Sequence, residues 1–179
     1  MVNTASKSAF DFLVRKSNEL SVQHPGPRDW RASPFDWLLA LPSGSRGAIA
    51  RRFVEDWANE EGLNAHQVSD TRQRYVVVNG HRVQVKMSTL WANGTYKFQQ
   101  IRDQDYEYTL CLGISPNDVH AWLIPKNELL IHLDGVAGQH TGASARETHW
   151  LQIDPARSDR WLSNFGNQLS DVRELLKDL

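Results

Sequence analysis

The sequence predicts an α/β (α+β) protein in which helices flank a central mixed β-sheet. Apolar residues in the first third of the chain recur at helical spacing, whereas those after Tyr75 alternate as in strands. The expected order is helix, hairpin, helix, strand, strand, which one sheet covered by helices accommodates. At 179 residues, the chain fits a single domain over 1–179 with a sizeable core.

Helices are expected at the front of the chain. SAFDFLVRKSNEL (8–20) and the short stretch SPFDWLLAL each suggest one, and residues 1–46 form a helical N-terminal extension. A longer helix follows the break Pro-Ser-Gly. Ile49, Phe53 and Trp57 recur every four residues in it, with Ala50 and Val54 beside them, and together define one broad apolar face. Gly62 is placed to end the helix.

The middle of the chain reads as strands. RYVVV and HRVQVK flank Asn79-Gly80, a pair that suits a tight primed hairpin turn. TYKFQQIRDQ is expected to form a short helix. YEYTLCLGI and VHAWLIP then read as strands joined by the turn SPND, and SNFGNQLSDVRELLKDL ends in an amphipathic helix. QHTGASARETHW is expected to be a surface loop, because it is polar and contains glycine.

Composition limits the classes of function. The net charge of -1 predicts no strong overall attraction to nucleic acid or membrane, although a local basic groove is compatible with it. No apolar run is long enough to span a bilayer, and the N-terminus lacks a secretory signal, so we expect no membrane association. Cys111, in an apolar run, reads as a buried inert thiol, which is consistent with a cytoplasmic protein. The seven histidines show no metal-binding spacing.

Strand periodicity places Gln84 and Lys86 on one face and Val83 and Val85 on the other. By itself, this pattern describes any half-buried strand. The ordered series VQVKMST, YKFQQIR, YEYTLCLGI and AWLIPK, however, resembles the PD-(D/E)XK nuclease superfamily, as a restriction-endonuclease-like protein with a variant QxK motif. The resemblance makes 47–125 a restriction-endonuclease-like core and 126–179 C-terminal loops and a helix.

The resemblance implies a Mg²⁺-dependent endodeoxyribonuclease of the restriction type, in which Mn²⁺ can substitute. Lys86 would assist the attacking water, while Asp70, Gln84 and the Val85 carbonyl would hold the metal. Gln84 departs from the family pattern, because an acid is usual there. Asp70 stands fourteen residues before Gln84 and is the sole carboxylate between Glu61 and Asp103. A tighter alignment of the hairpin expects this acid near 73–75, where none is present.

Several accessory positions remain open between a functional and a structural role. Glu55 resembles an acid that some family members add to the metal site, but its place opposite the apolar face favours a solvated residue. Gln99 and Gln100 match glutamines of the family's next helix and are otherwise exposed polar residues. The candidate DNA contacts are Ser88, Thr89, Trp91, Lys97 and Arg102.

The implied partner is double-stranded DNA, cut by a homodimer because a symmetric target favours a two-fold assembly. Restriction-like proteins often act beside a DNA methyltransferase, which is a further expected partner. Two alternatives stay open. The first is a catalytically silent DNA-binding relative on the same fold, and the second is a protein-interaction or immunity-type domain whose apolar residues serve core and partner surface.

Overall fold

The computed structural model describes residues 30–31, 33–69, 74–133, 149–157 and 159–179. The chain divides into two compact units, 1–33 and 34–179. The described part of the first unit is a turn in which the Ser33 N–H donates to the Trp30 carbonyl at 3.1 Å. The helix expected at 8–20 and the candidate acid Asp70 lie outside the described residues. The second unit contains every element named below.

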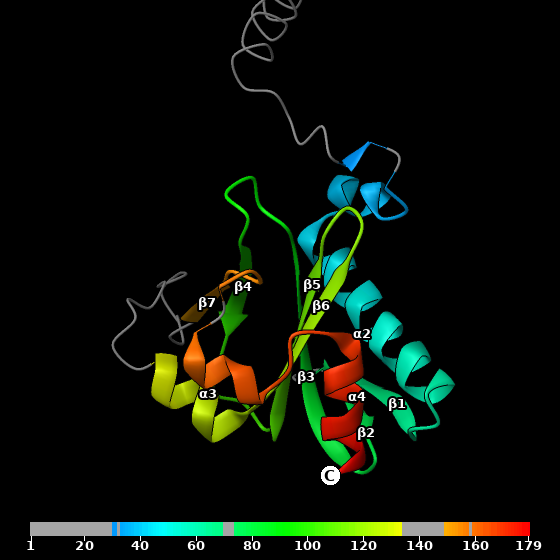
Figure 1. Cartoon of the computed structure of the whole chain (residues 1–179). Helices are drawn as coiled ribbons and strands as arrows, with labels where there is room; N and C mark the ends of the chain where they lie inside the picture. Colours follow the sequence, from blue (N-terminus) through cyan, green and yellow to red (C-terminus); the bar gives the residue numbers. More distant parts are fainter. Residues whose placement is uncertain (1–29, 32, 70–73, 134–148, 158) are drawn as a thin grey trace, which may run out of the picture. The chain divides into compact units, whose positions relative to one another are not determined.

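A mixed sheet with the strand order β1-β2-β3-β5-β6 forms the centre of the second unit (Figure 1). Only β3 and β5 run parallel; the other neighbours are antiparallel. A smaller antiparallel sheet consists of β4 (Tyr96–Ile101) and β7 (His149–Ile153). The predicted fold class, a mixed sheet flanked by helices, is confirmed. The strands of the larger sheet are β1 (Ala65–Ser69), β2 (Arg74–Val78), β3 (His81–Thr89), β5 (Tyr108–Ile114) and β6 (Val119–Pro125).

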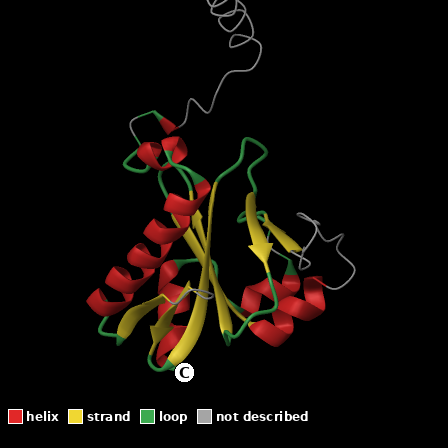
Figure 2. Ribbon diagram, turned by 180° about the vertical axis from the view of Figure 1, so that it is seen from behind, coloured by secondary structure: helices red, strands yellow, loops and turns green. Residues whose placement is uncertain are grey.

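Different elements cover the two faces of this sheet. Helices α2 (Ser43–Glu60) and α4 (Leu169–Lys177) lie on one face, whereas the β4–β7 sheet and helix α3 (Lys126–Leu133) lie on the other (Figures 1 and 2). The short 3₁₀ helices η2 (Asp36–Ala40) and η3 (Arg160–Asn164) complete the unit. The β4–β7 side contains an aromatic and aliphatic core cluster formed by Tyr96, Phe98, Ile101, Cys111, Trp122, Ile124, Leu129, Leu133, Leu151, Ile153 and Leu162.

Helix α2 begins after Pro42 and ends before Gly62, as expected, and Gly62 has the positive φ of 79° that a terminating glycine adopts. The helix contacts the sheet through the Ala50 and Val54 side of the predicted apolar face. The fully buried residues are small, which lets the helix approach the sheet closely, while the large apolar residues lie half-buried at its side. The buried set is Ala50, Val54 and Ala58, and the half-buried set is Ile49, Phe53 and Trp57.

The predicted hairpin is confirmed by its turn and by its register. Asn79 and Gly80 have φ values of 49° and 91°, so both central residues are left-handed, as a type I′ turn requires. Val78 pairs with His81 at the end of the ladder. The Asn79 side chain also donates from Nδ2 to the Leu176 carbonyl at 3.0 Å, so the turn contacts the last turn of α4.

The prediction of a short helix at TYKFQQIRDQ is wrong, because residues 96–101 form strand β4. Tyr96 and Phe98 alternate with half-buried Lys97 and are completely buried in the core cluster, and aromatic residues on a half-buried surface favour a strand. Four further elements, β1, α3, β7 and η3, were not predicted. The end of the expected loop QHTGASARETHW begins β7, and residues 134–148 lie outside the described part of the chain.

Contacts from other segments engage both edges of the larger sheet, which limits pairing with other strands. On the β1 edge, the Asn59 amide exchanges two hydrogen bonds of 2.9 Å with the backbone of Ala65. On the β6 edge, the Ala121 N–H donates to the Asn167 carbonyl at 3.1 Å. Among the described residues, no helix has the length and apolarity needed to cross a membrane.

Candidate active site

Gln84, Lys86 and Ser88 point to the face of the sheet that β4 covers. Parallel pairing sets Gln84 beside Thr109 and Lys86 beside Cys111 on this face. The same register places Ser88 beside Gly113, where a side-chain Cβ would meet the Tyr96 ring of β4 at 2.7 Å. The predicted shared face of Gln84 and Lys86 is therefore confirmed, and a second layer covers it so that Gln84 is buried and Lys86 half-buried.

The Lys86 ammonium is held by a bulge in β4. The pairing of β4 with β7 shifts register between Phe98 and Ile101, and Gln100 adopts a φ of 57°, which is unusual for a residue with a side chain. Lys86 Nζ donates to the Gln100 carbonyl at 2.6 Å. The backbone of Gln100 thus contacts the candidate catalytic lysine. The side chains of Gln99 and Gln100 are exposed, and they extend from a strand instead of the expected helix.

The environment of Lys86 disfavours its charge. Burial away from water lowers the pKa of Lys86 from its ordinary value of 10.5 to about 8, and the nearby positive charge of Arg102 also lowers it. Arg102 Nε is itself buried and has no hydrogen-bond partner among the described residues. Neither cation forms an ion pair with a carboxylate in the described part of the chain. Lys86 therefore has a second positive charge near it, and an anion would stabilise both.

Gln84 is 7% exposed and uses only one end of its amide. Its Nε2 donates to Gln104 Oε1 at 3.2 Å, and its own Oε1 has no partner in the described part of the chain. The β2–β3 ladder also stops at the Val76–Val83 pair, although β2 continues to pair with β1 as far as Arg74. The two strands of the hairpin therefore separate where Gln84, Val85 and Lys86 begin.

Glu55 is not the solvated residue that the sequence suggests. It is half-buried, and both carboxylate oxygens accept hydrogen bonds from Gln67, Oε1 from the backbone N–H at 3.2 Å and Oε2 from Nε2 at 2.6 Å. These bonds, like those of Asn59 one turn later, dock α2 on the edge of β1. In the described residues, no three histidine, cysteine, aspartate or glutamate side chains come together as a metal site.

The candidate DNA contacts differ in exposure. Ser88 is buried and joins β3 to β4, because its hydroxyl donates to the Thr89 carbonyl at 3.1 Å and accepts from the Lys97 N–H at 2.9 Å. Trp91 is 43% exposed, and Lys97 Nζ lies 4.0 Å from its ring centroid. The loop that carries Trp91 is closed by the Trp91 N–H donating to the Thr95 carbonyl at 2.9 Å. Trp91 is therefore presented on a structured loop.

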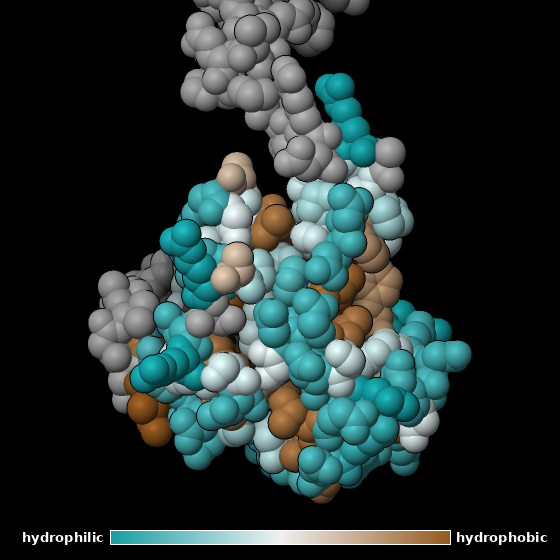
Figure 3. Space-filling model, viewed as in Figure 1, coloured by the Kyte–Doolittle hydropathy of each residue, from teal (hydrophilic) through white to brown (hydrophobic). Residues whose placement is uncertain are grey.

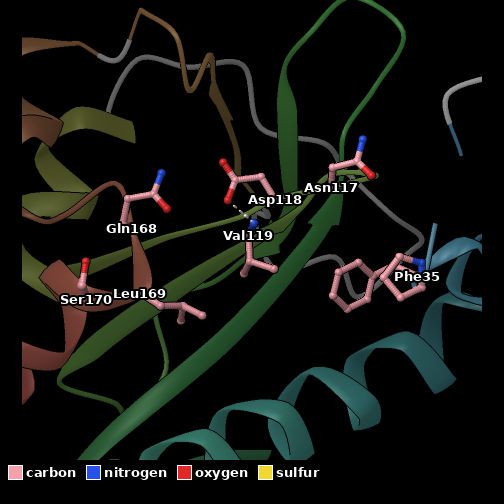
Figure 4. A pocket seen from close by; sticks show the side chains of 8 residues that line it. Phe35, Asn117, Asp118, Val119, Gln168, Leu169 and Ser170 are labelled. Carbon is pink, nitrogen blue, oxygen red and sulfur yellow. Dashed lines mark hydrogen bonds between the residues drawn. The ribbon is translucent and has the colours of Figure 1, made fainter.

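Hollows of the surface lie away from Lys86, and two of them have a defined lining. One, of about 590 Å³, is lined by Phe35, the turn residues Asn117 and Asp118, and the start of α4 (Figure 4). The other is an apolar groove beside α2, where Figure 3 shows hydrophobic surface. Neither is lined by a cation or by a predicted catalytic residue. The groove is lined by Phe35, Phe53, Val54, Trp57, Leu112, Ile114, Val119 and Leu169.

Sequence reasoning missed Gln104 and Lys126, which contribute to the same face as Gln84. Lys126 Nζ lies 2.6 Å from the Gln104 carbonyl and 2.6 Å from Asp103 Oδ1. Gln104 and Asp103 are in the connection between β4 and β5, and Lys126 begins α3, so only the fold brings them to Gln84. The basic residue of AWLIPK was the one available signal, because it closes the quoted motif series.

Comparisons with known proteins give likenesses among solved structures alone. No family model and no curated protein matches the chain. Among solved structures, the chain is similar to the bacterial homing endonuclease I-Ssp6803I, with 17% sequence identity and a TM-score of 0.47, over 76% of this chain and 93% of that one. This TM-score is too low to establish a shared fold, so the function is argued from the residues of this chain alone.

Proposed function

We propose that the protein is a Mg²⁺-dependent endodeoxyribonuclease of the restriction type that hydrolyses phosphodiester bonds of double-stranded DNA. The observation that carries this proposal is Lys86, a half-buried cation on the covered face of the sheet, which has the charge of Arg102 near it and no carboxylate partner among the described residues. Like charges repel, and a DNA phosphate is an anion that would stabilise both cations.

The proposed reaction needs a hard divalent cation beside Lys86. Mg²⁺ prefers oxygen ligands and keeps several waters, so few protein oxygens suffice. Gln84 Oε1 is a buried oxygen without a partner in the described part of the chain, which is the kind of donor such an ion would take. Asp70 and the Val85 carbonyl complete the proposed ligands. When bound, the ion would lower the pKa of a water and stabilise charge on the phosphate.

Lys86 is assigned to the attacking water and the scissile phosphate. Its pKa of about 8 keeps the ammonium in excess over the neutral amine by about ten to one at pH 7. An ammonium has three donor protons, of which the Gln100 carbonyl takes one. The two others are available to orient water and to bond a phosphate oxygen while one P–O bond forms and another breaks.

Trp91, Lys97 and Arg102, with Thr89, form the proposed contact surface for DNA. An exposed tryptophan on a structured loop offers a face on which a base or sugar stacks, and lysine and arginine bind the phosphates. A homodimer would present two such sites to the two strands, and a companion DNA methyltransferase would protect the host DNA. Both assignments are part of the proposal.

The neutral side chain at Gln84 favours one alternative, a DNA-binding relative without catalysis. An amide brings no charge to the metal, so affinity for Mg²⁺ depends more heavily on Asp70. Such a relative would bind DNA in a salt-sensitive manner and leave it intact with any divalent ion.

The test uses plasmid DNA and genomic DNA, methylated and unmethylated, with Mg²⁺ or Mn²⁺. Wild type is compared with Lys86→Ala and Asp70→Asn, and with Lys177→Ala as a surface control. Cleavage by wild type and by the control, lost in both site variants, supports the nuclease. Salt-sensitive binding with intact DNA under every condition supports the silent relative, and the absence of both binding and cleavage contradicts both proposals.

A further inference from the structure

The connection between β3 and β4 is a short, closed loop at one end of the larger sheet (Figure 1). The Gly94 N–H donates to the Trp91 carbonyl at 2.9 Å, and Gly94 has the positive φ of 79° that glycine adopts most readily. Asn93 Oδ1 accepts from the Thr95 N–H at 3.3 Å and from Thr95 Oγ1 at 2.9 Å. Because these bonds already fix the loop, it loses little conformational freedom when a ligand binds.

The loop presents Trp91 with a cation against one face of its ring. Lys97 Nζ lies over the indole, 4.0 Å from the ring centroid. The Lys97 backbone is fixed in β4, because its N–H donates to Ser88 Oγ at 2.9 Å and its neighbours Tyr96 and Phe98 are completely buried. The Trp91 side is still 43% exposed, so the surface that solvent reaches is the opposite face of the ring and its edges.

This pair of side chains matches the two parts of a nucleotide. An indole face stacks on a base, and an ammonium attracts a phosphate. In the described part of the chain, Lys97 makes no ion pair with a carboxylate, so its charge is available to a phosphate of the same strand.

A single accessible face limits which base can stack on Trp91. A side chain that wedges between two base steps is covered by bases on both of its faces. Trp91 has Lys97 at one face and therefore offers only the other. In a duplex, each base is covered by its neighbours in the stack, and the grooves present only base edges. A base that stacks on Trp91 is thus a base that has left the stack.

We propose that Trp91 and Lys97 bind one unpaired nucleotide of DNA, with its base on the accessible indole face. The inference rests on the proposed function and narrows its substrate to DNA with an unpaired base close to the cleaved bond. Trp91 follows Lys86 by five residues, so their Cα atoms are no more than about 18 Å apart. An intact duplex has to extrude a base before it can use this site, whereas gapped DNA does not.

The experiment measures binding by fluorescence anisotropy in the presence of EDTA, so that neither cleavage nor a divalent ion affects it. The probes are a duplex with a short single-stranded gap and the same duplex with the gap filled. A second gapped probe carries 2-aminopurine in the gap, because the fluorescence of this base falls when it stacks. The variants are Trp91→Ala, Trp91→Phe and Lys97→Gln. Trp37→Ala is the matched control, since Trp37 is 44% exposed, and urea unfolding verifies that each variant is folded.

We expect wild type to bind the gapped probe more tightly than the filled duplex, by about fivefold or more, and to quench 2-aminopurine. Trp91→Ala should weaken binding of the gapped probe about five- to a hundredfold and abolish the quenching, and Trp91→Phe should lie between the two. Lys97→Gln should weaken binding of both probes and lower the salt dependence by about one counterion. Trp37→Ala should behave as wild type.

Two results overturn the inference and leave the proposed nuclease standing. The first is equal affinity of wild type for gapped and filled DNA. The second is a preference for gapped DNA, with quenching, that persists in Trp91→Ala or that Trp37→Ala abolishes as well. If wild type binds neither probe, the proposed DNA substrate fails, and the inference fails with it.

Discussion

Replacing Lys86 with methionine is expected to stabilise the protein at neutral pH. Methionine keeps the length and apolar stem of the side chain and removes the ammonium. The charged ammonium destabilises the folded state, because burial lowers the pKa of Lys86 from 10.5 to about 8. A residue that lowers stability in this way is expected where function requires it.

The size of the effect follows from the pKa. A pKa shift of one unit corresponds to about 1.4 kcal/mol, so the charged form of Lys86 destabilises the folded state by about 3 kcal/mol. Because the side chain is only half-buried, solvent screening reduces this value to about 2 kcal/mol. The lost bond to the Gln100 carbonyl subtracts little, since Gln100 is exposed and water replaces the ammonium.

The sign of the pH dependence is fixed. Below pH 8, Lys86 is charged in both states and the full cost applies. Between about pH 8 and 10.5 the folded state has released its proton while the unfolded state retains it, so wild type gains stability as the pH rises. The advantage of Lys86→Met over wild type should therefore be about 2 kcal/mol at pH 7 and should shrink toward zero by pH 10.5.

Urea unfolding, followed by tryptophan fluorescence at several pH values from 7 to 10, measures this difference. Lys177→Met is the control for loss of one positive charge, because Lys177 is exposed at the end of α4. A Lys86→Met advantage that is absent at pH 7, or that grows as the pH rises, would refute the assigned cost of the charge.

Three other substitutions test the fold and the DNA surface. Gly113→Ala places a methyl group 2.7 Å from the Tyr96 ring and should lower the free energy of unfolding by about 1–3 kcal/mol. Gly44→Ala meets no atom within 4 Å and should not lower it. Equal effects of the two substitutions would contradict the close packing. Glu55→Ala should cost about 1–3 kcal/mol by urea unfolding through two lost hydrogen bonds to β1, and Glu55→Gln should cost less. Trp91→Ala should weaken DNA binding about five- to a hundredfold by fluorescence anisotropy, Trp91→Phe should weaken it less, and an unchanged affinity would exclude stacking.

The hairpin and its polar face could be predicted from the sequence because their signals are local. Asn79-Gly80 specifies the turn, and the strand period sets Gln84 and Lys86 on one side. The strands β5 and β6 were equally readable, since continuous apolar runs bounded by a turn indicate buried strands.

Strand β4 was misread because only its packing decides its structure. Tyr96 and Phe98 show the alternation of buried side chains that is typical of a strand, but at two positions only. The bulge at Gln100 then interrupts this alternation. The contacts made by Gln104 and Lys126 were beyond sequence reasoning for a related reason. These contacts join the β4–β5 connection to β3 and to the start of α3. The contacting residues are 20 or more positions apart in the sequence, so no local pattern predicts the contacts.

The Gln84–Lys86 face of β3 is proposed as a nuclease site. The single-turnover rate of Mg²⁺-dependent cleavage of plasmid DNA by wild type and by Lys86→Met at pH 7 tests this assignment. We predict that wild type cleaves and that the variant, although more stable, does not. Cleavage by Lys86→Met at the wild-type rate, or no cleavage by wild type with either Mg²⁺ or Mn²⁺, would contradict the account.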